Sequence, residues 1–257
     1  VHSLRRVFEQ AFAVHDIAVP LDSFDDSTSA EVVESFMEAK RLEVVGIREA
    51  GRMRGYVKRD DLGNGKCGDY VRSFDDGQIV SDLMPLHELI QRLSDTRRLF
   101  VAVLGRVGGI VSRSDLQKPP VRMWLFGMVT LIEMRMTRLI ERVCSDDEWK
   151  EFLSQGRVQK TEALLQERSR RNQDLSLLDC LQLSDKAQII ARNEKLRGVT
   201  RYESRAQFEK AAKMIERLRN NLAHSQDIVT NDWEAIVALS GSLDSVLDGP
   251  PEFQEKR

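Results

Sequence analysis

The chain has 257 residues, and its 39 basic and 41 acidic side chains nearly balance, which gives a formal net charge of −2. This length suits two domains that each bury a core, and the balance excludes a global field for nucleic acid or membranes, although a local basic patch remains possible at residues 168–171. Cys67, Cys144 and Cys180 are isolated in sequence, which argues against a disulfide framework or structural zinc and favours a cytoplasmic protein.

The first segment predicts an amphipathic helix over residues 1–16, with Leu4, Phe8, Ala11 and Phe12 on one face. We expect this helix to dock on the segment that follows. Its charged residues interrupt any long apolar core, so we expect no secretory signal here.

The next hundred residues contain an internal repeat. Residues 55–62 (GYVKRDDL) align with residues 109–116 (GIVSRSDL), and residues 41–47 align with residues 98–104. A helical pattern precedes each pair of segments. Each copy is therefore predicted to form a helix, a strand, a turn and a second strand, followed by an Asp-Leu pair that opens a helix. Only two copies occur, which excludes a solenoid.

The repeated unit resembles the CBS domain, and residues 15–118 resemble its two-copy module. The family signature is complete in the second copy as Gly109, Ser112 and Asp115. The resemblance implies that an adenine nucleotide (ATP, ADP, AMP or similar) binds between the copies. Ser112 and Asp115 would then hold its phosphate and its ribose diol. A carboxylate suits a diol because its two oxygens can accept from two adjacent hydroxyls.

The first copy departs from this signature. Lys58 stands where the hydroxyl residue is expected, while Asp61 is retained. Lys58 could meet a phosphate as a point charge, or this half-site could be empty, and we favour one occupied site over two. The alternative is that the pair only serves as a dimerisation scaffold. In that interpretation Asp61 and Asp115 are helix caps, because an aspartate that follows a strand often caps the next helix.

The Lys118-Pro119-Pro120 segment marks a domain boundary because proline breaks regular structure. The remaining sequence predicts a helical bundle that begins with a long helix over residues 121–143. The fold class is therefore α+β. We expect a CBS pair over residues 1–118, an all-α domain over residues 119–248, and a disordered tail over residues 249–257.

A long helix predicted from about Tyr202 ends in the sequence Arg219-Asn220-Asn221-Leu222-Ala223-His224. Arg219 falls within the apolar stripe of this helix, where a charge is costly unless it is paired or used. Asn220 and His224 are four residues apart and share a face. The stripe consists of Phe208, Ala212, Ile215, Leu218 and Leu222.

This motif, placed before the last helix of an all-helical domain, resembles the HEPN family over residues 121–247. The resemblance implies a homodimeric, metal-independent endoribonuclease in stress or phage defence, with the motifs of two chains facing each other. RNA carries its own nucleophile, the 2′-hydroxyl. His224 could act as base or acid, Arg219 could fork onto phosphate oxygens, and Asn220 could fix the imidazole tautomer or contact the phosphate.

On a straight helix Arg219 and His224 point about 140° apart, so a bend, a frayed end or a partner chain must bring them together. Alternatively, Arg219 pairs with a buried acid such as Glu133, and His224 is only a helix-end residue. We expect a cytoplasmic homodimer that acts on RNA, without a metal or a membrane, and whose nucleotide shifts the packing of the two motifs. The alternative function is an inactive nucleotide-sensing dimer that binds RNA or a protein partner.

Overall fold

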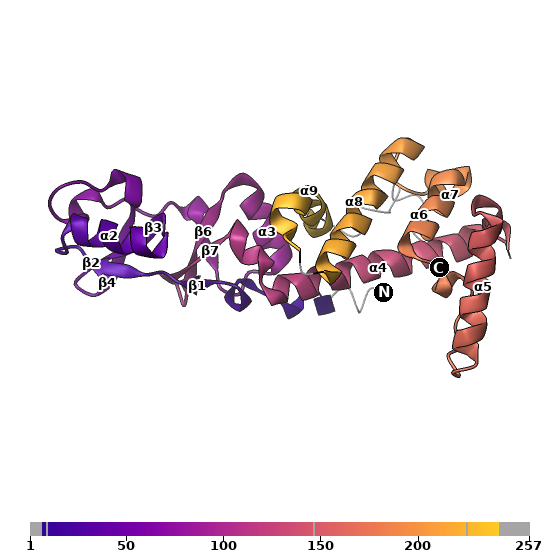
Figure 1. The fold of residues 1–257 in the computed structure, drawn as a ribbon. Helices are drawn as coiled ribbons and strands as arrows, with labels where there is room; N and C mark the ends of the chain where they lie inside the picture. Colours follow the sequence, from indigo (N-terminus) through magenta and orange to yellow (C-terminus); the bar gives the residue numbers. More distant parts are fainter. Residues whose placement is uncertain (1–6, 9, 146, 225, 242–257) are drawn as a thin grey trace. The chain divides into compact units, whose positions relative to one another are not determined.

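The computed structural model describes residues 7–8, 10–145, 147–224 and 226–241 (Figure 1). The chain forms two compact units, which are described separately below. The repeat unit is Phe12–Lys118, and the helical unit begins at Pro119. The predicted tail, residues 249–257, and the end of the predicted helical domain lie outside the described residues.

The described residues before Phe12 belong to the helical unit, whereas the sequence predicts that they dock on the repeat. The ring of Phe8 packs directly on Gly127 in the first long helix of that unit, so closely that a Cβ at Gly127 would lie 2.2 Å from Phe8 Cε1. The predicted extension of this helix to residue 16 is wrong. Ala13 instead forms an antiparallel bridge with Pro85, and Val14–Asp16 is a short 3₁₀ turn.

The repeat unit contains two sheets, one from each copy, and each sheet is flanked by a helix. In both copies a short strand runs parallel to the next strand, which pairs antiparallel with the third. The first copy consists of β2 (Ser23–Asp25), α2 (Ala30–Lys40), β3 (Val44–Glu49) and β4 (Arg52–Lys58). The second copy consists of β5 (Ile79–Ser81), α3 (Leu86–Asp95), β6 (Arg98–Val103) and β7 (Arg106–Ser112). The short strand β1 (Val19–Pro20) pairs with β7 at the edge of the second sheet.

The two copies agree in local detail, which confirms a repeat and the alignment of residues 55–62 with residues 109–116. The predicted alignment of residues 41–47 with residues 98–104 is wrong by three positions, because Val44 begins β3 where Arg98 begins β6. Each hairpin turns through two residues with positive φ, Ala50-Gly51 (48° and 76°) and Leu104-Gly105 (50° and 76°). Positive φ at both central residues defines a type I′ turn, whose twist matches that of the flanking strands. The register also shifts at the equivalent places, after Ile47 and after Val101.

The predicted helix start at each Asp-Leu pair is wrong. Arg59–Asp61 and Arg113–Gln117 form short 3₁₀ turns instead. After the second turn, Lys118 is extended (φ −64°, ψ 151°) because the following Pro119 disfavours helical geometry at the residue before it. Lys58 and Ser112 therefore end β4 and β7, and Asp61 and Asp115 lie in the tight turns that follow.

An apolar cluster joins the two copies. Leu21, Val44, Tyr56 and Phe100 are buried together, and the rings of Tyr56 and Phe100 lie 4.7 Å apart between centroids. Burial of such surface is the main favourable term in packing. The cluster fixes β3 and β4 of the first copy against β6 and β7 of the second, and it places the ends of these strands beside one crevice.

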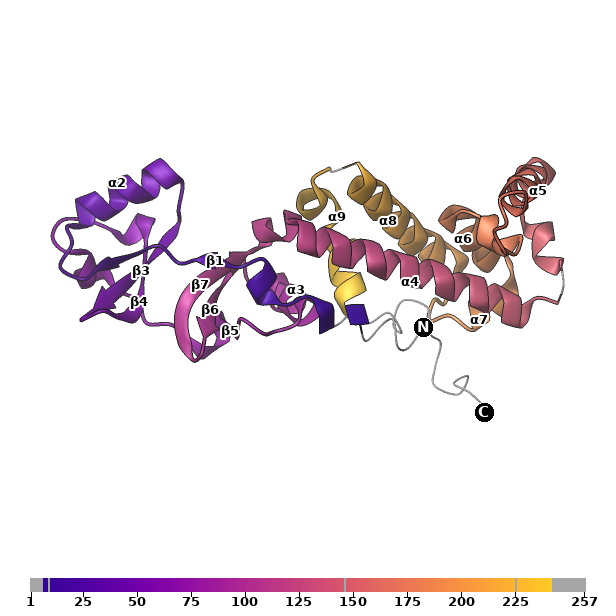
Figure 2. The same cartoon turned by 90° about the horizontal axis from the view of Figure 1, so that it is seen from below.

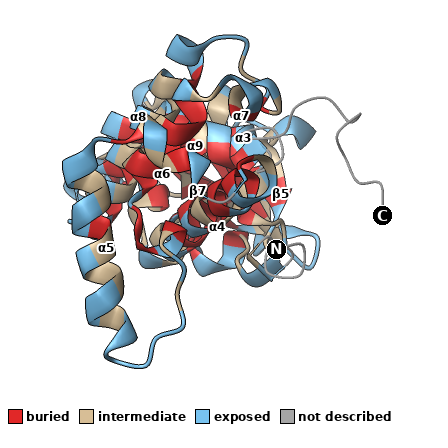
Figure 3. Cartoon of the chain, turned by 90° about the vertical axis from the view of Figure 1, so that its right-hand side faces the viewer, coloured by how far each residue is buried: buried red, intermediate tan, exposed pale blue. Residues whose placement is uncertain are grey.

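The described part of the helical unit contains helices and 3₁₀ turns but no strand, as predicted for this half of the chain. The long helix α4 is central, with α6, α7, α8 and α9 packed on it (Figure 2). By contrast, α5 is mostly exposed or half-buried (Figure 3). The bounds are α4 (Pro119–Val143), α5 (Gln155–Ser169), α6 (Leu183–Arg192), α7 (Glu194–Gly198), α8 (Arg205–Ala223) and α9 (Ile228–Gly241).

Candidate functional sites

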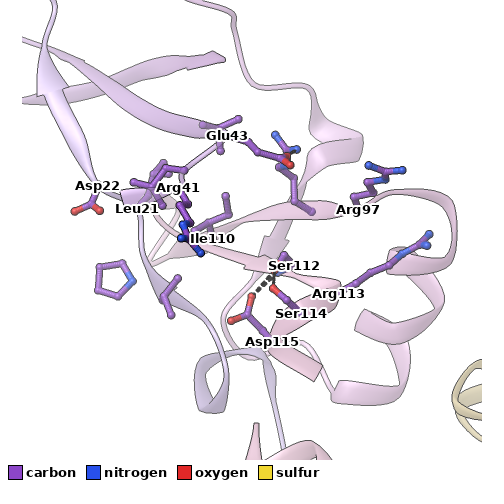
Figure 4. Close-up of a pocket in the computed structure, with 15 residues that line it drawn as sticks. Leu21, Asp22, Arg41, Glu43, Arg97, Ile110, Ser112, Arg113, Ser114 and Asp115 are labelled. Carbon is purple, nitrogen blue, oxygen red and sulfur yellow. Dashed lines mark hydrogen bonds and ion pairs between the residues drawn. The ribbon is translucent and has the colours of Figure 1, made fainter. Parts of the chain in front are cut away.

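A cavity of about 620 Å³ lies between the two copies of the repeat, and we call it the Ser112 cavity (Figure 4). Its lining combines residues from the end of β7 with residues that flank the start of β3. Because both copies contribute, neither could form this site alone. The polar lining residues include Asp22, Arg41 and Glu43 from the first copy and Arg97, Arg98, Ser112, Ser114 and Asp115 from the second.

The predicted pair Ser112 and Asp115 lies together in this cavity. Asp115 Oδ2 accepts from the Ser112 backbone N at 2.7 Å and from Ser112 Oγ at 2.8 Å, and Lys118 Nζ lies 2.8 Å from Asp115 Oδ1. Asp115 therefore caps its own turn, as the scaffold interpretation requires. Each carboxylate oxygen has two acceptor positions, so this cap still leaves Asp115 capacity to accept from a ligand hydroxyl.

Arginines supply positive charge around the pair. Arg41 ends α2 in the left-handed conformation, with φ 56°, and Arg97 and Arg98 begin the second copy's hairpin. Arg113 has a different role, because its Nε and Nη2 donate to the carbonyls of Leu93 and Ser94 at 2.7 and 2.8 Å. Its side chain points away from Ser112 and Asp115 (Figure 4). Arg113 thus fastens the end of α3.

A second cavity of about 550 Å³ occupies the equivalent place beside the first copy, and we call it the Lys58 cavity. Lys58 lines it, together with Tyr56 and Phe100. Asp61, its predicted companion, instead lies 2.6 Å from Arg72 Nε, and this hydrogen bond lowers the pKa of Asp61. The Lys58 cavity therefore lacks the hydroxyl–carboxylate pair of the Ser112 cavity.

Three residues, Glu43, Arg97 and Arg98, line both cavities and form the wall between them. Within this wall Arg98 Nη2 donates to Glu43 Oε2, and burial lowers the pKa of Arg98. The sequence analysis missed this pair. No signal in the sequence indicated it, because Arg98 begins β6 at the position where Val44 begins β3, so the repeat does not relate Arg98 to Glu43 or to Arg41.

The predicted motif of the helical unit lies at the exposed end of α8. Arg219 is half-buried at the edge of the apolar stripe, while Asn220 and His224 are exposed. Arg219 Nη1 lies 3.4 Å from Asn220 Oδ1, so the structure brings these two residues together. His224 is the C-terminal cap residue of the helix. The suggested pairing of Arg219 with Glu133 is wrong, because Glu133 Oε1 accepts from Lys186 at 3.2 Å.

Two neighbouring helices fix the end of α8. Arg122 on α4 donates to the carbonyls of Asn221, Leu222 and Gln226 at 3.0 to 3.1 Å. The last carbonyls of a helix lack partners within the helix, so Arg122 acts as a cap supplied from another element. From α9, fully buried Asp232 accepts from Asn221 Nδ2 and Arg217 Nε, both at 2.7 Å. The motif therefore lies on a braced helix end.

Among the described residues, no cluster of three or more His, Cys, Asp or Glu side chains is arranged to hold a metal ion. Over the same residues, no helix is both long enough and apolar enough to cross a bilayer.

No protein-family model and no curated protein sequence matches this chain. Solved structures of CBS-domain proteins do match its N-terminal part. CBSX2 from Arabidopsis thaliana, in complex with AMP, is 21% identical and has a TM-score of 0.36, with 41% of this chain and 93% of that chain covered. A CBS domain protein from Pyrobaculum aerophilum, complexed with AMP, is 16% identical (TM-score 0.36; 44% and 96% covered).

The CBS domain of a bacterial CNNM/CorC family Mg²⁺ transporter, in complex with ATP, is 14% identical, with a TM-score of 0.37 and with 47% of this chain and 93% of that chain covered. These matching structures come from the family that the sequence repeat resembles.

Proposed function

We propose that the repeat unit senses an adenine nucleotide, bound in the Ser112 cavity. The observation that carries this proposal is a cavity of about 620 Å³ that is lined by the Ser112–Asp115 pair together with Arg41, Arg97 and Arg98. This volume lies within the range of small-molecule sites. Three of the matching structures are of CBS-domain proteins in complex with AMP or ATP, which supports the same ligand class.

Each part of a nucleotide has a matching group in this cavity. The arginines neutralise the phosphates, and a guanidinium can donate to two phosphate oxygens at once. Ser112 Oγ donates its one proton to Asp115, so it donates to a phosphate only when this bond breaks, and Asp115 Oδ1 accepts from a ribose hydroxyl. Apolar lining from Leu21 and Ile110 suits the face of the base.

The first prediction concerns Asp115→Ala. It should weaken ATP or AMP binding by about tenfold or more, because a buried ligand hydroxyl loses its acceptor. The measurement is isothermal titration together with the ligand-induced shift of the melting temperature. Asp69→Ala is the matched control, since Asp69 also caps a 3₁₀ turn, through Lys66 N, but lines neither cavity. If the parent protein shows no shift with any adenine nucleotide, the cavity is not a nucleotide site and the repeat is a scaffold.

For the helical unit we propose metal-independent RNA cleavage at Arg219, Asn220 and His224. These side chains are grouped on a braced, solvent-accessible helix end, which supports the proposal. The RNA 2′-oxygen attacks phosphorus and its proton passes to a base, the bond from phosphorus to the 5′-oxygen breaks, and that oxygen takes up a proton. His224 serves proton transfer, and Arg219 stabilises the phosphate charge. In this proposal a second chain completes the site.

The second prediction is that His224→Ala and Arg219→Ala each lower the cleavage rate by about a hundredfold or more. The assay is digestion of RNA in the presence of EDTA, with separation of the products. Arg205→Ala is the control, because Arg205 is an exposed arginine at the opposite end of α8. Equal background cleavage by the parent and both variants would reject the nuclease. An inactive nucleotide-sensing dimer that binds RNA or a protein partner would then be the better description.

The continuous chain between Asp115 and α4 links the proposed nucleotide site to the helix that supports the cleavage motif. Lys118, which pairs with Asp115, directly precedes α4. Arg122, in the first turns of α4, caps the end of α8. A ligand that engages Asp115 competes with Lys118 and therefore acts at the start of the helix that braces the motif. Such regulation requires that the ligand favour one arrangement over another.

A further inference from the structure

The wall between the two cavities contains a carboxylate where a phosphate site needs positive charge. Glu43 and Arg98 form an ion pair there, and both residues line both cavities. The side chain of Arg98 is 26% exposed and that of Glu43 is 64% exposed. Arg98 is therefore held partly out of water with Glu43 as its partner, while Glu43 itself remains largely hydrated.

A phosphate that enters the Ser112 cavity competes with Glu43 for the same guanidinium. Displacing Glu43 costs the ligand part of an ion pair, since the Arg98 side chain is only 26% exposed. If Glu43 stays in place, however, its charge lies beside the phosphate and repels it. Both effects oppose the ligand, and the repulsion grows with the number of phosphate charges.

We infer that Glu43 is a specificity-determining residue, which competes with ligand phosphates for Arg98 and so weakens nucleotide binding. The inference rests on the proposed nucleotide function and names a residue that restrains it. It predicts an unusual direction of change, since loss of this cavity-lining side chain strengthens binding. The affinity of a ligand without phosphate should not change when the Glu43 carboxylate is removed.

The chain offers a matched control in Asp22. This residue lines the same cavity and carries the same charge, but its carboxylate lies 3.4 Å from Lys40 Nζ, and Lys40 lines neither cavity. Asp22→Asn therefore removes one negative charge from the cavity without freeing an arginine. The double variant Glu43→Gln/Arg98→Gln tests whether the effect of Glu43 passes through Arg98.

The third prediction is tested by isothermal titration of the full chain with ATP, AMP and adenosine. We expect Glu43→Gln to bind ATP about fivefold more tightly than the parent, which is the upper end for a partly exposed ion pair, to bind AMP more tightly by a smaller factor, and to bind adenosine unchanged. Asp22→Asn should differ from the parent by less than about twofold, because exposed paired charges contribute little. The gain for ATP should disappear in the double variant.

Two results overturn this inference while the nucleotide function stands. One is a parent that binds ATP together with a Glu43→Gln variant whose affinity is equal or lower. The other is an equal gain in Asp22→Asn, which would indicate a general charge effect. If the parent binds no nucleotide at all, the proposed function and this inference both fail, so the two failures are distinguishable. Glu43 is largely exposed, and a melting curve without ligand verifies that the variant folds.

Discussion

Asp232 is the residue on which the end of α8 most depends. Its side chain is fully buried and accepts from two residues of α8. Its own backbone departs from helical geometry (φ −125°, ψ 22°), which places a kink in α9. A kink in a helix needs an identifiable cause, and here the side chain serves the neighbouring helix at the position where the backbone deviates.

The fourth prediction is that Asp232→Ala lowers the free energy of unfolding by about 2–3 kcal/mol, because Asn221 and Arg217 lose a buried acceptor. We place the value below that of a fully buried ion pair, since the side chain of Arg217 is 56% exposed and water can replace part of the interaction. Urea unfolding measures the change. Glu234→Ala, an exposed change on the same helix, should stay within about 0.5 kcal/mol. Equal losses in both variants would contradict this role.

At the scale of elements, each hairpin of the repeat has a turn whose sequence matches the preferred residues at only one of the two central positions. Type I′ turns favour Asn or Asp followed by Gly. Both hairpins carry the glycine, but Ala50 and Leu104 occupy the first position with positive φ. Leu104 is also 97% exposed. Backbone strain and apolar exposure thus coincide at Leu104.

The fifth prediction is that Leu104→Asn stabilises the repeat unit by about 0.5–1 kcal/mol, because asparagine tolerates the left-handed region far better than leucine. The measurement is chemical unfolding of the full chain. Leu83→Asn serves as the control, since Leu83 is also exposed but has no positive φ. An equal gain in the control would assign the effect to lost apolar exposure, and a loss of stability in Leu104→Asn would contradict the turn argument.

At the scale of the whole molecule, the two copies of the repeat form two cavities that differ in their lining residues. The Ser112 cavity retains the hydroxyl and carboxylate, whereas in the first copy Lys58 replaces the hydroxyl and Asp61 pairs with Arg72. The wall between them is shared, because Glu43, Arg97 and Arg98 line both cavities. The helical unit follows directly after the Ser112 turn in sequence, which is how the proposed sensing and cleavage activities are linked in one chain.

The sequence by itself determined the features that depend on neighbours along the chain. The repeat, the boundary at Lys118-Pro119, the long helix α4 and the stripe on α8 follow from periodicity, turn residues and proline, and the structure agrees with them. The position of Ser112 beside Asp115 also follows, since the two residues are three positions apart at one turn.

Only the tertiary structure decided the pairings between distant residues. Glu43 meets Arg98, Arg122 meets the end of α8, and Phe8 packs on Gly127 rather than on the repeat. The partner of a charged side chain depends on which elements pack together, and no local spacing specifies this. The same holds for Asp61, which the resemblance implies for a nucleotide site and whose hydrogen bond with Arg72 no local spacing specifies.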